Sequence, residues 1–182
     1  MRALVVFESM YGNTHTIADR IADGLRPAFD VTVCAVADAT PTLVAASDLV
    51  VVGGPTHVHG MSSSTSRRAA VDALAKDDTL VLDEDAEGPG LRDWFDGLGE
   101  QRAAAAAAFD TRIDAPPALT GRASKGISKR LRKHGFRVVA DPESFLVDKH
   151  SRLLDGEEDR ARAWGATLAA LAAQTSITSS GP

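Results

Sequence analysis

A short polar turn near the start of the chain carries the side chains best suited to bind a small anion. It offers the hydroxyl groups of Ser9, Tyr11 and Thr14, the side-chain amide of Asn13 and the flexible backbone of Gly12. The turn contains no lysine or arginine, so it does not match the loop in which a lysine contacts the β- and γ-phosphates of a nucleotide. Hydroxyl and amide groups alone suit a terminal monophosphate in an enclosed site.

The elements on either side of this turn place it at the start of a helix. Residues 4–7 form an unbroken apolar run, which is typical of a strand buried on both faces. After the turn, apolar residues recur at helical spacing from Thr14 to Leu25, which predicts an amphipathic helix. A buried strand followed by a tight turn and a helix presents backbone N–H groups and the positive helix end at the carboxyl edge of the strand. This arrangement favours phosphate or another anion.

The stretch from Val5 to Thr14, followed by Ala18 and Ile21 at set intervals, resembles the flavodoxin fingerprint. Proteins of the flavodoxin family bind flavin mononucleotide (FMN) non-covalently and hold its phosphate in this loop. The resemblance therefore implies FMN as the cofactor. It also implies that the phosphate loop consists of Ser9, Met10, Tyr11, Gly12, Asn13 and Thr14.

Further strands and helices follow in the alternating order of a doubly wound α/β protein. Strands are predicted at residues 31–36 and 49–54, and a last strand covers 136–140 and 144–147, with an interruption at Asp141–Pro142. The alanine-rich residues 103–109 favour a helix by propensity, but the topology requires a strand there, and we predict a strand. The resemblance implies a flavodoxin-like sandwich whose five-stranded parallel sheet has the order 2-1-3-4-5. One domain is expected over residues 1–173, with a disordered tail at 174–182.

The segment after the strand at 49–54 is the second loop expected at the site, because ligands of such sheets lie where the strand order reverses. In the flavodoxin family this loop packs on the flavin ring. The loop also resembles that of the quinone-reductase branch, Pro-Thr-Arg-Phe-Gly-Asn-Met, but His57, Val58 and His59 replace its Arg, Phe and Gly. The resemblance implies that the ring is bound by Pro55, Thr56, His57, Val58, His59 and Gly60.

The two histidines of this loop leave three interpretations open. They can contact the flavin, remain solvated or bind a metal ion. Two ligands on a loop with no nearby cysteine or carboxylate are weak evidence for a metal, so no metal site is predicted.

The family's third flavin loop is expected at the end of the alanine-rich strand, at Asp110, Thr111 and Arg112. Asp110 and Thr111 can offer backbone groups to the pyrimidine side of the ring. Arg112 either stabilises negative charge on the reduced flavin or pairs with an acidic residue.

A basic segment follows this third loop. Residues 122–137 contain seven lysines and arginines and no acidic residue, and their pattern predicts an amphipathic helix. The charged face is either an ordinary solvated surface or a docking surface for an acidic partner protein or for the phosphate of NADPH.

Composition sets limits on the class of protein. The chain has 182 residues, of which 44% are hydrophobic and 25% charged, which suits one globular α/β domain. A formal net charge of −5 argues against a general nucleic-acid binder. The sequence has no apolar run of about 18 residues that would predict a membrane span, and its single cysteine excludes a disulfide framework. We expect a cytoplasmic protein.

Three functions remain open on sequence grounds. The first is electron transfer to a redox partner protein through bound FMN. The second is an FMN-dependent NAD(P)H:quinone-type oxidoreductase. The third is a flavin-free domain of the same fold that binds a partner protein. We favour the electron carrier slightly over the oxidoreductase. The modest acidity and the missing aromatic residue in the second loop are the features that support the oxidoreductase.

Overall fold

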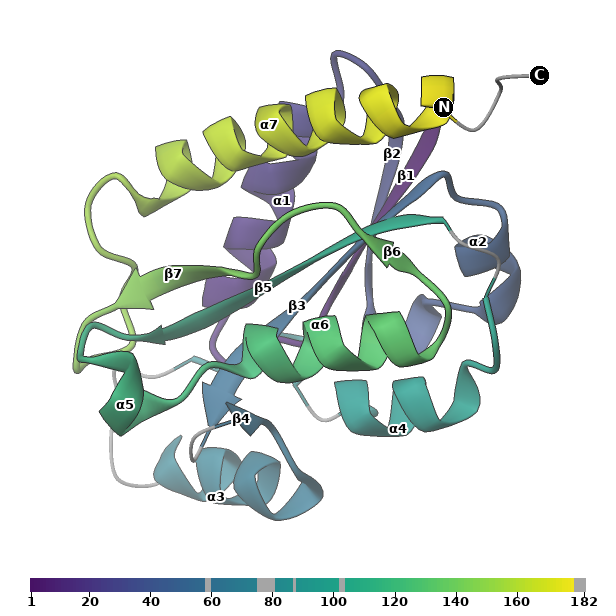
Figure 1. The fold of residues 1–182 in the computed structure, drawn as a ribbon. Helices are drawn as coiled ribbons and strands as arrows, with labels where there is room; N and C mark the ends of the chain where they lie inside the picture. Colours follow the sequence, from purple (N-terminus) through teal and green to yellow (C-terminus); the bar gives the residue numbers. More distant parts are fainter. Residues whose placement is uncertain (58–59, 75–80, 87, 102–103, 179–182) are drawn as a thin grey trace.

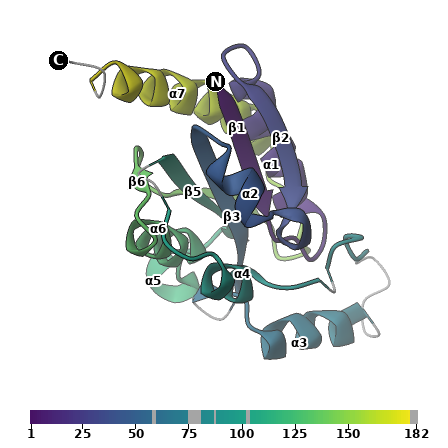
Figure 2. The same cartoon turned by 90° about the vertical axis from the view of Figure 1, so that its right-hand side faces the viewer.

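The computed structural model describes residues 1–57, 60–74, 81–86, 88–101 and 104–178, and shows a parallel sheet between two layers of helices (Figures 1 and 2). The strand order is β2-β1-β3-β5, and β6 and β7 both pair with β5. These strands are all parallel, which confirms the predicted order with a last strand broken near Asp141–Pro142. The strands are β1 (Arg2–Phe7), β2 (Asp30–Ala35), β3 (Leu49–His57), β5 (Ala105–Ile113), β6 (Arg137–Val138) and β7 (Glu143–Val147).

The helices lie on both faces of the sheet and beyond its carboxyl edge. α1 and α7 cover one face, α2, α4 and α6 cover the other, and α3 lies beyond the carboxyl end of β3 (Figure 2). A short β4 (Gly60–Met61) pairs antiparallel with the end of β3. The helices are α1 (Asn13–Leu25), the 3-10 helix η1 (Val36–Asp38), α2 (Pro41–Ala45), α3 (Ser64–Leu74), α4 (Leu91–Gly97), α5 (Pro117–Thr120), α6 (Ala123–Lys133) and α7 (Glu157–Thr178).

The apolar run at residues 4–7 is buried because alternate side chains enter two separate cores. Val5 and Phe7 pack in the core formed with α1 and α7. Leu4 and Val6 pack in the core formed with α4 and α6. All four are at most 2% exposed, so the strand has no solvent-facing side and a polar residue anywhere in it would be desolvated. This is why the strand has no polar residue between Ala3 and Phe7.

The alanine-rich stretch forms a strand, as the topology requires. Ala105–Ala108 form the first half of β5 and are buried, with alternate residues in the two cores. Phe109 follows them and fills the space left by Gly53 on the paired strand, where an added Cβ atom would lie 2.1 Å from the ring. Pairing of the alanines with β3 and β6 therefore outweighs their helix propensity.

α7 runs to Thr178, so it includes residues 174–178, which the sequence analysis assigned to the tail. Residues 179–182 lie outside the described part of the chain. Across the described ranges, no helix is both long and apolar enough to span a membrane.

α1 and α7 approach each other closely at two glycines. A Cβ atom on Gly165 would lie 2.2 Å from the carbonyl oxygen of Ile21, and one on Gly24 would lie 2.1 Å from that of Arg162. Both neighbours are helix backbone, which cannot move without separating the helices. The crossing therefore requires glycine at both positions.

We predict that Gly165→Ala lowers the free energy of unfolding by about 1–3 kcal/mol, because the new methyl group forces the two helices apart. The control is Gly97→Ala at the end of α4, where an added Cβ atom would meet nothing within 4 Å. That change should leave stability unchanged or raise it by about 0.5–1 kcal/mol. Urea unfolding of both variants tests the packing, and equal effects would contradict it.

Candidate functional site

A pocket of about 160 Å³ opens at the carboxyl ends of β1, β3 and β5. It contains residues from all three loops that the sequence predicted. Ile113, Val147 and Ser151 also line it, and these three were not predicted from the sequence. The predicted residues that line the pocket are Met10, Tyr11, Asn13, Thr14, Pro55, Thr56, His57, Thr111 and Arg112.

The remaining predicted residues lie elsewhere. Ser9 and Gly12 are in the first loop but not in the pocket lining, Asp110 is in the core and Gly60 is in β4. Val58 and His59 lie outside the described residues, so their predicted contact with the flavin stays a prediction.

The first loop ends in a helix terminus with free donors. Gly12 has a φ of +82°, in the left-handed region that glycine adopts without strain, and α1 begins directly after it. α1 has no side-chain cap and no acidic residue in its first turn, which leaves its first backbone N–H groups for an anion. The Ser9 Oγ accepts a hydrogen bond from the Gly12 N–H at 3.1 Å, so its own hydroxyl hydrogen remains available.

Thr14 joins the first loop to the third. Its Oγ1 lies 2.8 Å from the Oγ1 of Thr111, and both residues are buried. If Thr111 donates in this pair, the Thr14 hydroxyl retains a hydrogen for a ligand. Asn13 is committed differently, because its Nδ2 donates to the carbonyl oxygen of Ser151 at 2.7 Å. That contact brings the turn after β7 into the pocket. Ser151 has a φ of +58°, but its type and position in the sequence gave no sign of this role.

The second loop is a hairpin rather than an irregular loop. β3 continues through Thr56 and His57, which pair with Met61 and Gly60 of β4. The Thr56 Oγ1 accepts a hydrogen bond from the backbone N–H of Ala123 at 2.9 Å, so the hairpin is fixed to the start of α6.

The third loop begins later than predicted because β5 continues to Ile113. Asp110 is fully buried, and its Oδ2 accepts a hydrogen bond from the Ser124 N–H at 2.7 Å, which stabilises the start of α6. The backbone of Asp110 and Thr111 lies between β3 and β7, in register with both strands. In this structure Asp110 therefore positions a helix and does not line the pocket.

Arg112 has one donor without a partner. Its guanidinium donates to the carbonyl oxygens of Ile113 and Ala115 and to the Thr120 hydroxyl, and it forms no ion pair with an acid among the described residues. The Nε atom is buried and has no hydrogen-bond partner in the described part of the chain. A buried donor with no acceptor is unfavourable by about 1–3 kcal/mol, so this atom suits an acceptor on a bound ligand.

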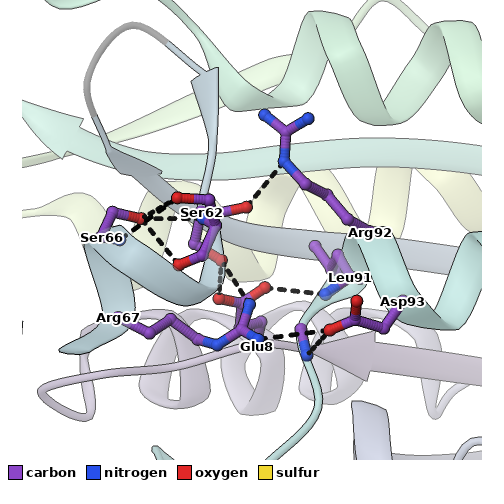
Figure 3. Close-up of polar contacts among 9 residues, drawn as sticks. Glu8, Ser62, Ser66, Arg67, Leu91, Arg92 and Asp93 are labelled. Carbon is purple, nitrogen blue, oxygen red and sulfur yellow. Dashed lines mark hydrogen bonds and ion pairs between the residues drawn. The ribbon is translucent and has the colours of Figure 1, made fainter.

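Glu8 is a buried carboxylate at the junction of β1 and the first loop (Figure 3). It accepts a hydrogen bond from the Ser62 hydroxyl through Oε1 and one from the Leu91 N–H through Oε2, the latter at 2.9 Å. Arg67 lies beyond Ser62, donates to its hydroxyl at 3.4 Å and forms an ion pair with Asp93 at 3.2 Å. The network connects β1 with the chain segments around α3 and α4, and Glu8 itself is stabilised by neutral donors.

The Glu8 carboxylate acts electrostatically on His57. Burial is the main cause that lowers the pKa of His57 below its ordinary value of about 6.5, and the Glu8 carboxylate acts in the opposite direction. The imidazole is therefore neutral at pH 7.

Among the described residues, no group of three or more His, Cys, Asp or Glu side chains is placed to hold a metal ion.

An acidic segment after α3 packs on the first loop. The backbone N–H of Asp83 donates to the Met10 carbonyl oxygen at 2.9 Å, and its carboxylate lies 3.3 Å from the Nδ1 of His15. The Asp83 side chain is only 3% exposed. Burial and the charges of Asp83, Glu84 and Asp38 raise the pKa of Asp85. A phosphate in the first loop would therefore be repelled by these carboxylates on one side. The attraction from the helix terminus and the hydroxyl groups must be stronger than this repulsion.

These residues fit FMN in chemistry and only partly in volume. The first loop supplies hydroxyl groups and helix N–H groups for a phosphate, and Arg112 supplies an unpaired donor. The pocket is smaller than the roughly 300–1,000 Å³ usual for small-molecule sites. A ring bound here would thus remain partly exposed at the edge of the sheet.

A family model described as flavodoxin matches residues 5–164. The chain belongs to the flavodoxin family. FMN is the cofactor that membership implies, together with electron transfer. No curated protein matches the chain at a significant level.

Solved structures share the fold of this flavodoxin family member. A flavodoxin from the domain Archaea is 19% identical with a TM-score of 0.65, and the match covers 95% of this chain and 99% of that one. Oxidised flavodoxin 1 from Bacillus cereus is 20% identical with a TM-score of 0.64, covering 92% and 97%. A flavodoxin, WrbA-like protein from Agrobacterium tumefaciens is 20% identical with a TM-score of 0.60, covering 95% and 98%.

We predict that Glu8→Gln lowers the pKa of His57 further, because it removes the negative charge that opposes the effect of burial. Glutamine has the same shape. Its amide oxygen can accept from the Leu91 N–H and its NH2 group can donate to the Ser62 hydroxyl oxygen, so the stability should change little. Imidazole titration by NMR measures the effect. His134, whose Nδ1 lies 2.8 Å from the Gly99 carbonyl oxygen, and His150, which is exposed in the turn after β7, serve as internal controls. An unchanged His57 titration would mean that the two groups do not interact.

Proposed function

We propose that this protein is an electron carrier that binds FMN non-covalently in the pocket at the carboxyl edge of its sheet and passes electrons to a partner protein. The observation that carries the proposal is the uncapped start of α1, which has no acid in its first turn and is flanked by the hydroxyls of Ser9 and Thr14. FMN, when bound, supplies the redox chemistry, and the protein sets affinity, potential and access.

Each loop has a separate task in this proposal. The first loop and the start of α1 hold the phosphate. The hairpin with His57 lies against the ring and excludes water from one side of it. Arg112 places a positive charge and a free Nε–H where negative charge develops upon reduction. The neutral His57 adds no charge to the site at pH 7, so Arg112 is the cation of the pocket lining.

Purified protein supplemented with FMN tests the proposal directly. Uptake of FMN and stepwise one-electron reduction by dithionite, with a long-wavelength absorbance band at the midpoint, would support an electron carrier. Complete two-electron bleaching by NAD(P)H alone would support the oxidoreductase instead. Protein that takes up no FMN would overturn the proposal and leave the flavin-free domain.

Thr14→Ala should weaken FMN binding by about one to two orders of magnitude, because a hydrogen bond to a charged group contributes roughly 1.5–3 kcal/mol. The matched control is Thr111→Val, which breaks the same Thr14–Thr111 hydrogen bond but keeps the Thr14 hydroxyl. Riboflavin, which lacks the phosphate, should bind both variants nearly as it binds the wild type. Fluorescence titration measures these affinities, and equal losses of FMN affinity in the two variants would contradict the phosphate contact.

Arg112→Gln should lower the midpoint potential of the bound FMN. The positive charge and the Nε–H of Arg112 stabilise the negatively charged reduced cofactor more than the neutral oxidised one, so their removal disfavours reduction. Each tenfold loss of preference for the reduced form corresponds to about 60 mV for a one-electron step. Arg112→Lys keeps the charge without the Nε–H and should fall between the wild type and Arg112→Gln. Potentiometry that gives one potential for all three proteins would exclude this role.

A further inference from the structure

The outer face of α6 carries a row of three lysines. Lys125, Lys129 and Lys133 recur at every fourth position, which places them on one side of the helix. All three are exposed. We call them the lysine row. The opposite side of α6 is apolar and buried against the sheet, where it presents Ile127 and Leu131 to the core.

The arginines near the row have partners within the chain, and the lysines have none in its described part. Arg122 donates to the Ser144 hydroxyl and the Pro142 carbonyl, Arg130 pairs with Asp96, and Arg132 donates to the Ser128 hydroxyl. In the described part of the structure, none of the three lysines has an ion pair or a side-chain hydrogen bond. Like charges four residues apart on a helix repel each other, so the row is an uncompensated positive surface.

The lysine row begins beside the site. The Ala123 N–H at the start of α6 is bonded to Thr56, which lines the pocket, and Lys125 is two residues further along. α6 also packs on the hairpin, because a Cβ atom on Gly126 would lie 3.4 Å from the Cε of Met61. A protein that binds over the row would therefore lie against the exposed edge of the pocket.

The sign of this local charge opposes that of the whole protein. The chain has a formal net charge of −5, so at long range it repels an acidic protein. At physiological salt, charges are screened over about 8 Å, and a partner near the surface responds mainly to the nearest groups. The lysine row thus determines the local attraction once the partner is close.

We infer that the lysine row is the docking surface for a redox partner with an acidic face. This inference rests on the proposed electron-carrier function. Electrostatic complementarity at such a surface raises the association rate and orients the partner, so the exposed edge of the pocket faces it. Binding of the NADPH phosphate to the same lysines is the competing outcome of the test.

The test measures electron transfer from the FMN-loaded, reduced protein to two one-electron acceptors of opposite charge, acidic plastocyanin and basic cytochrome c. The variant is Lys125→Glu with Lys129→Glu. The matched control is Arg2→Glu with Arg162→Glu, which changes the net charge by the same amount. Both arginines are exposed. Arg2 is at the start of β1, and Arg162 is in α7, which lies across the sheet from α6. The FMN content and melting temperature of both variants are compared with the wild type first.

At physiological salt the lysine variant should slow transfer to plastocyanin at least tenfold, while the control slows it no more than about threefold. Transfer from the wild type to plastocyanin should decrease as salt is raised above the physiological concentration, because screening then weakens the local attraction. This decrease should vanish or reverse in the lysine variant. Transfer to cytochrome c should not be slowed by the lysine variant.

Three outcomes would overturn the inference. Equal effects of the two variants would mean that only net charge matters, and no effect of either would mean that the row is a solvated helix face. An unchanged rate with plastocyanin together with a raised KM for NADPH would assign the row to the nucleotide. In the first two cases a normal FMN content leaves the proposed function standing, whereas assignment of the row to NADPH would favour the oxidoreductase. Failure to load FMN would overturn both the inference and the proposed function.

Discussion

Burial of the sheet on both faces is the constraint that positions every part of the site. Alternate residues of β1 and β3 enter two cores, so the register of these strands is fixed on both sides and a shift by one residue would exchange the cores. Parallel strands held in this way end at a common edge. The first loop, the hairpin and the end of β5 meet there, although they are distant in sequence. The lysine row reaches the same edge through the bond between Ala123 and Thr56.

The sequence was informative wherever one physical requirement dominated the choice of residue. The apolar runs predicted the buried strands, and the hydroxyl-rich turn before an amphipathic helix predicted the location of the first loop. The alanine-rich strand needed the topology as a second argument, because alanine propensity alone favours a helix. In these cases the required pattern lies within a short stretch of the chain, so it can be read without knowing the tertiary contacts.

Long-range contacts explain what the sequence did not reveal. The end of β5 depends on its pairing with β7, which begins some thirty residues later, so Asp110 entered the core and Ile113 entered the pocket. Ser151 reaches the pocket only through its bond to Asn13. Glu8 is a charged residue directly after an apolar strand, and this was a usable signal for a buried carboxylate. Its partners Ser62 and Leu91 come from segments whose approach to β1 no local pattern encodes.

The close approach of α1 and α7 at Gly24 and Gly165 determines when α1 gains this packing partner. α1 carries the first loop at its amino end, and the helix that packs along it is the last element of the chain. During synthesis, the first strand, turn and helix leave the ribosome long before α7 exists, so one apolar side of α1 has no partner until the end. Contacts between such distant segments form slowly. The helix that follows the first loop therefore gains this packing partner only after a much later segment of the chain has formed.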